Sequence, residues 1–202
     1  MKIGPKYKIA RRLKAPVFEK TQTQKYVLSE AKKTKVEKRR GAMSDYGRQL
    51  IEKQKARYTY LLSERQFSKY VAEAMNRKGM KNADALYENL ERRLDNAIFR
   101  LGYAPSRPMA RQLVSHGHIQ VNGVRVTRPS YQMKINDKIK IRELSLAKPL
   151  FAKLDERLQG INAPIWFKSD TAKKEADIVS LPKRDGADML FDLNSVLEFY
   201  SR

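Results

Sequence analysis

Apolar residues recur every three or four positions between residues 44 and 101, which is the spacing of the buried side of helices. Ser44 and Ser63 are suitable N-caps, and Gly79 follows the second apolar stripe. The pattern predicts three helices in succession: residues 44–62, 63–78 and 82–101. The second stripe is expected to be buried, its aromatic residues included: Phe67, Tyr70, Val71, Ala74 and Met75.

A further capped helix is predicted over residues 106–117. Ser106 is a suitable N-cap, Pro108 fits the first turn because its missing N–H is not needed there, and Gly117 provides a left-handed exit. One arc of this helix is apolar and should be buried: Met109, Ala110, Leu113 and Val114. The other arc is polar and should face solvent: Arg107, Arg111, Gln112, Ser115 and His116.

Asn122-Gly123 is a strong signal for a two-residue hairpin turn, because both positions need a positive φ. The turn sets the strand pairs, whose side chains should share one apolar face: Val121 with Val124 and Ile119 with Val126. After an Asn136-Asp137 turn, residues 138–142 alternate strictly and predict a third strand. Its inward and outward positions follow from the alternation: Ile139 and Ile141 inward, and Lys138, Lys140 and Arg142 on a basic outer face.

The remaining C-terminal pattern is weaker. It predicts a short helix over residues 149–160, extended pieces at 165–167 and 178–181, and a final apolar run over 193–200. Trp166, the only tryptophan, has apolar neighbours, so we expect it to pack in a core, for which the helices of residues 44–90 are one candidate.

The net charge of the chain indicates what kind of partner it binds. The 202 residues fit two small domains, and their net charge of +21 is typical of a protein that binds a polyanion. The excess is uneven: residues 1–40 hold 14 Lys and Arg against 3 acids, and residues 92–143 hold 11 against 3. Residues 1–43 show little periodicity, so we expect much of this arm to order only against RNA, with a plain disordered tail as the alternative.

Several kinds of chemistry are excluded or disfavoured. The chain has no cysteine, so disulfides and Cys-based zinc sites cannot form. Its only histidines, His116 and His118, have no nearby acid that would complete a metal site. It has no phosphate-binding loop, no H-E-x-x-H and no G-x-S-x-G motif, and no apolar run of the length that spans a membrane. We expect neither an enzyme nor a membrane protein.

Residues 106–131 resemble the αL-type RNA-binding module named after small-subunit ribosomal protein S-four. Short motifs carry this resemblance: Ser106-Arg107, Ala110-Arg111-Gln112-Leu113-Val114, His116-Gly117-His118-Ile119, Val121-Asn122-Gly123 and Pro129-Ser130-Tyr131. The module also occurs in pseudouridine synthases, tyrosyl-tRNA synthetases and heat-shock proteins. Four flanking segments, however, look like the ribosomal protein, so the resemblance covers nearly the whole chain: GPKYKIARR, SDYGRQLIEKQKARYTYLLSERQF, LERRLDNAIFRLGYA and VLEFYSR.

The resemblance implies an α+β, mainly helical fold, in which a discontinuous helical domain holds an inserted αL-type RNA-binding module of helices packed on a short antiparallel sheet. The expected parts are a basic N-terminal arm (1–43), a helical domain (44–91, completed by 156–202) and the module (92–155). Many relatives bind zinc through a Cys cluster near this N-terminus. The GPKYKIARR pattern here has no thiol, so a zinc-less bacterial or organellar type without cofactor is implied.

The resemblance also implies a structural component of the small ribosomal subunit that binds small-subunit rRNA directly and helps nucleate assembly. It further implies a contribution to decoding accuracy, neighbouring small-subunit proteins as partners, and messenger RNA as another candidate partner. The expected location is the ribosome in the cytoplasm, with an organellar ribosome left open. The expected RNA-binding residues are Lys6, Lys8, Arg11, Arg12, Arg39, Arg40, Arg92, Arg93, Arg107, Arg111, Gln112, His116, His118, Asn122, Arg125, Arg128 and Lys140.

Two alternatives stay open at this point. An RNA-modifying enzyme, or another translation factor, could use the same module as a tether, although the rest of the chain shows no catalytic motif. A polybasic protein that compacts DNA or binds membrane surfaces would account for the charge. It would not need capped helices or an Asn-Gly hairpin.

Overall fold

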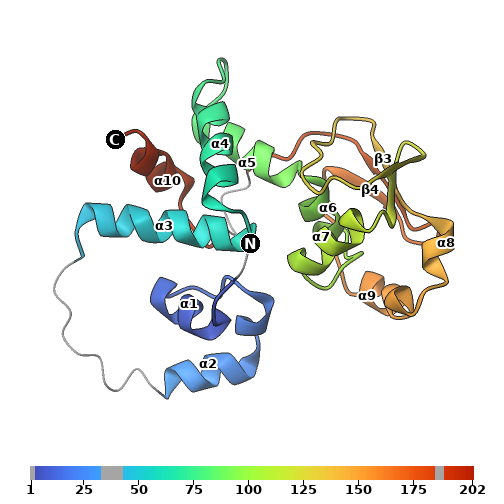
Figure 1. The fold of residues 1–202 in the computed structure, drawn as a ribbon, viewed down its shortest axis with the longest axis horizontal. Coiled ribbons are helices and arrows are strands. Elements are labelled where there is room, and N and C mark those ends of the chain that lie inside the picture. The colour runs from blue at the N-terminus through green and yellow to red at the C-terminus, as the bar shows by residue number, and fades with distance from the viewer. Residues whose placement is uncertain (1–2, 33–42, 185–188) are drawn as a thin grey trace. The chain divides into compact units, whose positions relative to one another are not determined.

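The computed structural model describes residues 3–32, 43–184 and 189–202. The chain forms two compact units, Met1–Leu86 with Asp185–Arg202, and Tyr87–Arg184 (Figure 1). The chain thus leaves the first unit and returns to it at its end. The α+β fold with a discontinuous helical unit, which the resemblance implied, is confirmed.

The N-terminal arm is folded where the structure describes it. Helix α1 (Lys6–Leu13), a 3-10 turn (Glu19–Thr21) and helix α2 (Gln24–Ala31) enclose a small core. That core consists of Ala10, Leu13, Ala15, Val17, Phe18 and Leu61. The expectation of an arm without its own packing is therefore wrong for these residues. The cause is that its scattered apolar residues are completed by a neighbour from later in the chain, such as Tyr58, whose ring meets Phe18 edge to face at 5.9 Å.

The helices of the first unit begin where the capping residues predicted. Helix α3 (Asp45–Thr59) follows Ser44, whose Oγ accepts a hydrogen bond from the Gly47 N–H at 3.2 Å. Helix α4 (Glu64–Met75) follows Ser63 in the same way, at 3.3 Å from the Gln66 N–H. Phe67 is fully buried, as predicted, whereas Tyr70 is half-buried and Met75 is exposed, so the buried stripe is narrower than expected.

Helix α10 (Leu193–Tyr200) packs against α3 and α4 and completes this unit (Figure 1). The Tyr200 hydroxyl donates to Glu64 at 2.6 Å, and its ring lies 6.2 Å from that of Phe67. Phe199 lies 5.4 Å from Tyr46 on α3, while Lys53 sits 4.3 Å from the centre of the Phe199 ring. The C-terminal helix is thus held by aromatic contacts to helices that lie far away in sequence.

The third predicted helix is broken in two. Helix α5 (Asn82–Glu91) ends before Arg93, which is extended (φ −67°, ψ 135°), and α6 (Leu94–Arg100) starts after it. The break lets the backbone bond to a later segment, since the Met133 N–H donates to the Arg92 carbonyl at 3.0 Å. Apolar spacing continues through the break, so periodicity alone predicted one helix. Arg93, one of the expected RNA-binding residues, is buried at this break.

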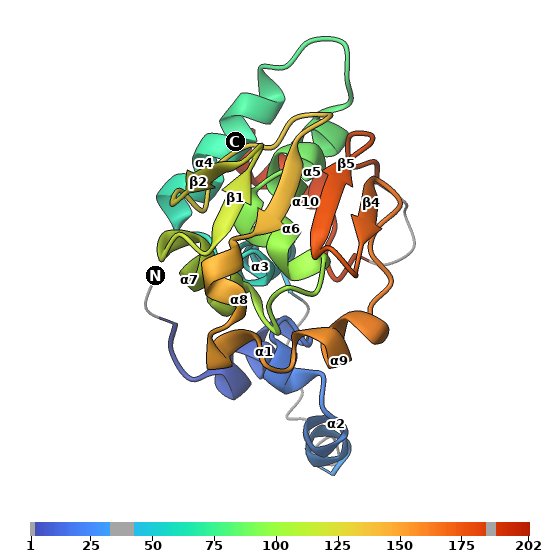
Figure 2. The same cartoon turned by 90° about the vertical axis from the view of Figure 1, so that its right-hand side faces the viewer.

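The strands of the described residues form one antiparallel sheet of order β2-β1-β3-β5-β4 (Figure 2). They are β1 (Ile119–Val121), β2 (Val124–Val126), β3 (Lys138–Ile141), β4 (Phe167–Asp170) and β5 (Glu175–Ile178). The predicted hairpin register is confirmed, with Ile119 opposite Val126 and Val121 opposite Val124. Asn122 (φ 51°) and Gly123 (φ 79°) make the turn as expected.

One face of this sheet covers helices α6 and α7 (Arg107–Ser115) and forms the main core of the second unit (Figure 2). Ile119, Ile139 and Ile141 are fully buried in it. The register places the four hairpin side chains on one face, as predicted, but Val124 is 68% exposed and Val126 is half-buried, so this face is covered only on its β1 side. The reason is that β2 is an edge strand that extends beyond the helices.

The boundary between the units differs from the expected one. Strand β5 pairs with β3, and β4 pairs with β5, so residues 156–184 belong to the second unit rather than to the helical unit. Trp166 is buried in the same core as Ile139, which confirms the expected packing role of its side chain. The pairing of β3 with β5 joins segments that are more than thirty residues apart, and local sequence patterns do not encode such a partner choice.

The segment between β3 and β4 contains short helical pieces. Helix α8 (Glu143–Leu146) follows β3 directly, and the predicted helix over 149–160 is divided into a 3-10 turn (Pro149–Phe151) and α9 (Leu154–Gln159).

The predicted cap of α7 is confirmed in position only. Ser106 occupies the N-cap position of α7, but its side chain accepts no capping hydrogen bond.

Gly123 is expected to be needed for its backbone conformation alone. A Cβ at this position would meet nothing within 4 Å, yet its φ is +79°. Gly123→Ala should lower the free energy of unfolding by about 1–2 kcal/mol, because L-residues disfavour the left-handed region. Urea unfolding would measure it. Gly160→Ala is the matched control, since Gly160 has φ −99° and open surroundings. An equal loss in both variants would contradict the assignment.

Candidate nucleic-acid interface

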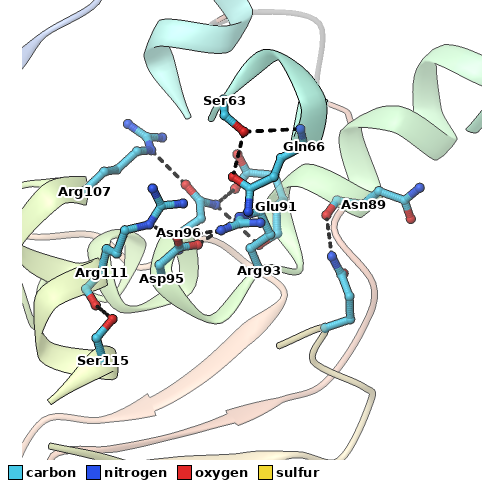
Figure 3. Close-up of polar contacts among 11 residues, drawn as sticks. Ser63, Gln66, Asn89, Glu91, Arg93, Asp95, Asn96, Arg107, Arg111 and Ser115 are labelled. Atoms are coloured by element: carbon cyan, nitrogen blue, oxygen red, sulfur yellow. Dashed lines mark hydrogen bonds and ion pairs between the residues drawn. The ribbon is translucent and has the colours of Figure 1, made fainter. Parts of the chain in front are cut away.

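Asp95 holds two of the arginines that the sequence assigned to the RNA surface (Figure 3). Arg93 faces its carboxylate with two nitrogens, Nε at 3.0 Å from Oδ1 and Nη2 at 2.7 Å from Oδ2. Arg111, on α7, donates from Nε to Oδ2 at 3.3 Å. The Arg93 and Asp95 side chains are only 1% and 8% exposed, so this pair is part of the interior and not a solvated contact.

Glu91 bonds to two further side chains, Arg100 and Asn96, of which Figure 3 shows Asn96. Its buried carboxylate accepts two hydrogen bonds from Arg100, both at 3.0 Å, and one from the Asn96 amide at 2.9 Å. Asn96 in turn accepts from Arg107 Nε at 2.9 Å, and the Arg107 guanidinium lies 4.4 Å from the centre of the Phe99 ring. The helix α7 arginines are therefore fixed to α6 through polar side chains.

These contacts correct the expected role of the polar arc on α7. Arg107 and Arg111 were predicted to project into solvent, but both are half-buried and tied to buried groups. Arg92 is likewise bonded to Glu88, at 2.8 Å, and to the Met133 carbonyl. Periodicity found the apolar arc correctly, because Ala110, Leu113 and Val114 are buried. It could not find acids on a neighbouring helix.

The predicted basic face of β3 is also paired. Lys140 Nζ lies 3.0 Å from Glu143 and 3.2 Å from Glu175, and the hydrogen bonds that Lys140 donates to these two carboxylates raise its pKa. Lys138 lies 3.8 Å from Glu175 and 3.9 Å from Asp177. The acids come from α8 and β5. The outward direction of both lysines is confirmed, but their charge is locally balanced.

Other expected contact residues remain at the surface, around the C-terminal end of α7 and the hairpin. Gln112, His116, Arg125 and Arg128 are all exposed. The Arg125 guanidinium donates to the His116 carbonyl at 3.2 Å and lies directly on Gly117, where a Cβ would come within 1.9 Å of Nε. Gly117 therefore serves two purposes, a left-handed exit from the helix (φ +71°) and a flat backbone surface for Arg125.

His118 and Asn122 are structural in this unit. His118 is buried, its Nδ1 lies 2.9 Å from Ser145 Oγ, and its ring meets Phe151 edge to face. Asn122 donates from its amide to Asp137 and accepts from the Lys138 N–H, both at 2.8 Å. Asp137 also accepts from the Lys134 N–H at 2.8 Å, so the hairpin turn and the turn before β3 brace each other.

In the N-terminal arm, the expected RNA-binding residues that the structure describes all lie on α1. Lys8, Arg11 and Arg12 are exposed on α1, and Lys6 lies 5.7 Å from the Phe18 ring centre. Arg11 is paired with Glu30 of α2 at 2.6 Å. Arg39 and Arg40 lie outside the residues that the structure describes.

Two further cations, Arg142 and Lys148, were not among the expected RNA-binding residues. Arg142 follows β3 and donates its N–H to the His118 carbonyl at 2.9 Å, and Lys148 follows α8. The alternation of β3 did place Arg142 outward. Nothing in the sequence, however, indicated that it would lie beside His118, because that depends on the pairing of β1 with β3.

The described residues contain no group of three or more His, Asp or Glu side chains that could hold a metal ion, and none of their helices has the length and apolar character needed to cross a membrane.

Asp95 should matter for folding well beyond its single charge. Asp95→Ala deprives the buried Arg93 guanidinium of this carboxylate, and breaking a buried pair typically costs about 3–5 kcal/mol. Urea unfolding would measure the loss. Asp155→Ala is the control, because Asp155 is exposed and pairs with Lys174 at 3.2 Å, where about 1 kcal/mol or less is expected. Equal stabilities of the two variants would show that the pair adds nothing.

His118 should make stability depend on pH. Burial, together with the charges of Lys148, His116, Arg142 and Arg125, lowers its pKa in the folded chain. The unfolded chain therefore takes up this proton first, and stability should fall as pH decreases below about 6.5, the ordinary pKa of histidine. Urea midpoints from pH 8 to pH 5 would measure this, and the fall should be smaller in His118→Gln. Parallel curves for the two proteins would contradict it.

Comparison with known proteins follows the same division of the chain. The model described as "S4 domain" matches residues 92–139, and that described as "Ribosomal protein S4/S9 N-terminal domain" matches residues 1–94. The small ribosomal subunit protein uS4 of Roseiflexus castenholzii is 40% identical over 206 residues, covering 99% of this chain and 98% of that protein. Those of Herpetosiphon aurantiacus and Natranaerobius thermophilus are 44% and 42% identical, each over 81% of this chain and 78% of the relative. The chain belongs to the uS4 family of small ribosomal subunit proteins.

Proposed function

We propose that this protein is a structural component of the small ribosomal subunit, that it binds small-subunit rRNA directly and that it helps nucleate assembly of the subunit. One observation carries the proposal: within the S4 domain match, the exposed basic residues His116 and Arg125 lie where α7 ends and the hairpin begins. The cations of α6 and β3, by contrast, are matched to acids in the same unit.

The physical basis is recognition of shape and backbone. An RNA duplex has a deep, narrow major groove and a shallow minor groove, so proteins contact its phosphates and its form more than its bases. Exposed arginine and lysine side chains on a rigid framework suit that mode, since a guanidinium can bond two phosphate oxygens at once. Arg125 and Arg128 in the second unit, and Lys8 and Arg12 on α1, are the exposed candidates for such contacts.

The finer parts of the proposal rest on family resemblance. They include contacts with neighbouring small-subunit proteins, a location in the cytoplasmic ribosome, a contribution to decoding accuracy, and an approach of Arg39 and Arg40 to the path of messenger RNA. The paired arginines Arg93, Arg107 and Arg111 enter the proposal as supports of the module and not as solvated phosphate contacts.

An RNA-modifying enzyme that uses the module as a tether is the competing function. The relatives named above are ribosomal proteins and are not named as enzymes, which agrees with the expected non-catalytic role. The competing function would require a catalytic unit, whereas the first unit consists of helices closed by aromatic packing.

Binding to small-subunit rRNA should be specific and sensitive to salt. Each neutralised phosphate adds about 0.7–0.9 to the slope of log affinity against log salt. Filter binding at several salt concentrations should give a slope of several units for small-subunit rRNA. At physiological salt it should give weaker binding of tRNA and duplex DNA.

Equal affinities for the three nucleic acids would favour a nonspecific polybasic protein. A slope near zero would overturn the proposed function, because the exposed cations would then contact no phosphate.

A further inference from the structure

A cluster of cations surrounds the point where α7 ends, β1 begins and β3 leads into α8. His116 lies at the C-cap of α7, and its ring is 6.1 Å from that of His118. Arg125 donates to the His116 carbonyl, and the Arg142 N–H donates to the His118 carbonyl at 2.9 Å. The Lys148 N–H donates to the Ser145 carbonyl at 3.0 Å, and Ser145 is the side-chain partner of His118.

No carboxylate that the structure describes is paired with the cations of this cluster, in contrast to those of α6 and β3. Among the described residues, no ion pair joins His116, Arg125, Arg142 or Lys148 to an acid within 4 Å. Glu143 is adjacent to Arg142 in sequence, but its side chain is 80% exposed and pairs with Lys140. The Nε of Arg142 is buried and makes no hydrogen bond. A buried donor without an acceptor costs about 1–3 kcal/mol, so the fold retains an unfavourable feature here.

We propose that Arg142 and Lys148, together with His116 and Arg125, form a phosphate-binding site around the end of α7. The proposal rests on the function proposed above, and the ligand is a phosphodiester group of RNA. It adds two residues, Arg142 and Lys148, to the expected contact surface and assigns them to the same phosphate as His116 and Arg125.

The chemistry of the cluster favours a phosphate over other partners. A phosphate offers several acceptor oxygens with a full negative charge, which suits guanidinium, ammonium and imidazole groups carried by neighbouring segments of the chain. The positive electrostatic potential of the cluster also acts on His118. Burial lowers the pKa of His118, and the four basic residues of the cluster lower it further. A bound anion would counter these charges. No acidic group appears among the neighbours that act on His118.

The site is tested in the full chain with a pair of substitutions and a matched pair. Arg142→Gln with Lys148→Gln removes two cations from the cluster, whereas Lys168→Gln with Lys173→Gln removes two exposed cations from β4 and the turn after it. In filter binding to small-subunit rRNA, the first pair should weaken affinity at least tenfold and lower the salt slope by about one. The control pair should change affinity less than threefold.

Arg142→Lys separates geometry from charge, because it keeps the cation and removes the planar donor group. We expect it to weaken rRNA affinity severalfold. Unchanged affinity in Arg142→Lys, together with equal losses of affinity in the two double variants, would overturn the site, because only the total positive charge would then matter for binding.

A second measurement needs no RNA and also guards against a folding defect. Thermal midpoints are compared in inorganic phosphate and in sodium chloride of equal ionic strength, because a ligand that binds only the folded chain raises the midpoint. Phosphate should raise the midpoint of the wild type and of the Lys168/Lys173 variant more than that of the Arg142/Lys148 variant. Equal shifts in all three overturn the site. Failure of the wild type to bind rRNA would instead overturn the proposed function.

Discussion

The buried Arg93–Asp95 pair is the constraint on which the second unit depends. A charged guanidinium in the interior is tolerated only when its charge and its donors are matched, and Asp95 matches both with two hydrogen bonds. Arg93 is the extended residue between α5 and α6, so the pair lies at the bend between these helices. The same carboxylate reaches Arg111 on α7, so one acid ties the bend to the helix of the candidate interface.

Local signals predicted the elements of this fold well. Ser44 and Ser63 cap their helices, Asn122-Gly123 makes the hairpin turn with the expected register, and the strict alternation at Ile139 and Ile141 places both side chains in the core. Each of these features is decided within a few residues. The folded chain keeps these local structures because its tertiary contacts favour the same conformations as the local sequence.

Non-local features were beyond the same reasoning. The break at Arg93 depends on residues 131–133, the pairing of β3 with β5 joins distant segments, and the N-terminal core needs Leu61. The predicted solvent exposure of Arg107 and Arg111 was wrong for the same reason. A helical wheel shows which arc of α7 is polar, but Asp95 and Asn96, which bind Arg111 and Arg107, lie on another helix. Composition therefore identified the kind of partner more securely than the residues that meet it.

The division of cations into paired and unpaired groups has a functional consequence. An arginine fixed by a buried acid brings rigidity but little net charge, whereas a cluster without acids brings charge that the fold itself does not neutralise. Asp95 and Glu91 stiffen the face formed by α6 and α7 next to the region where His116, Arg125, Arg142 and Lys148 gather. A rigid support lowers the entropy lost when exposed side chains bind a ligand. The basic residues of this unit therefore have two different roles. Internal ion pairs stabilise the framework, whereas the cluster without acids supplies the unbalanced positive charge that attracts a polyanion.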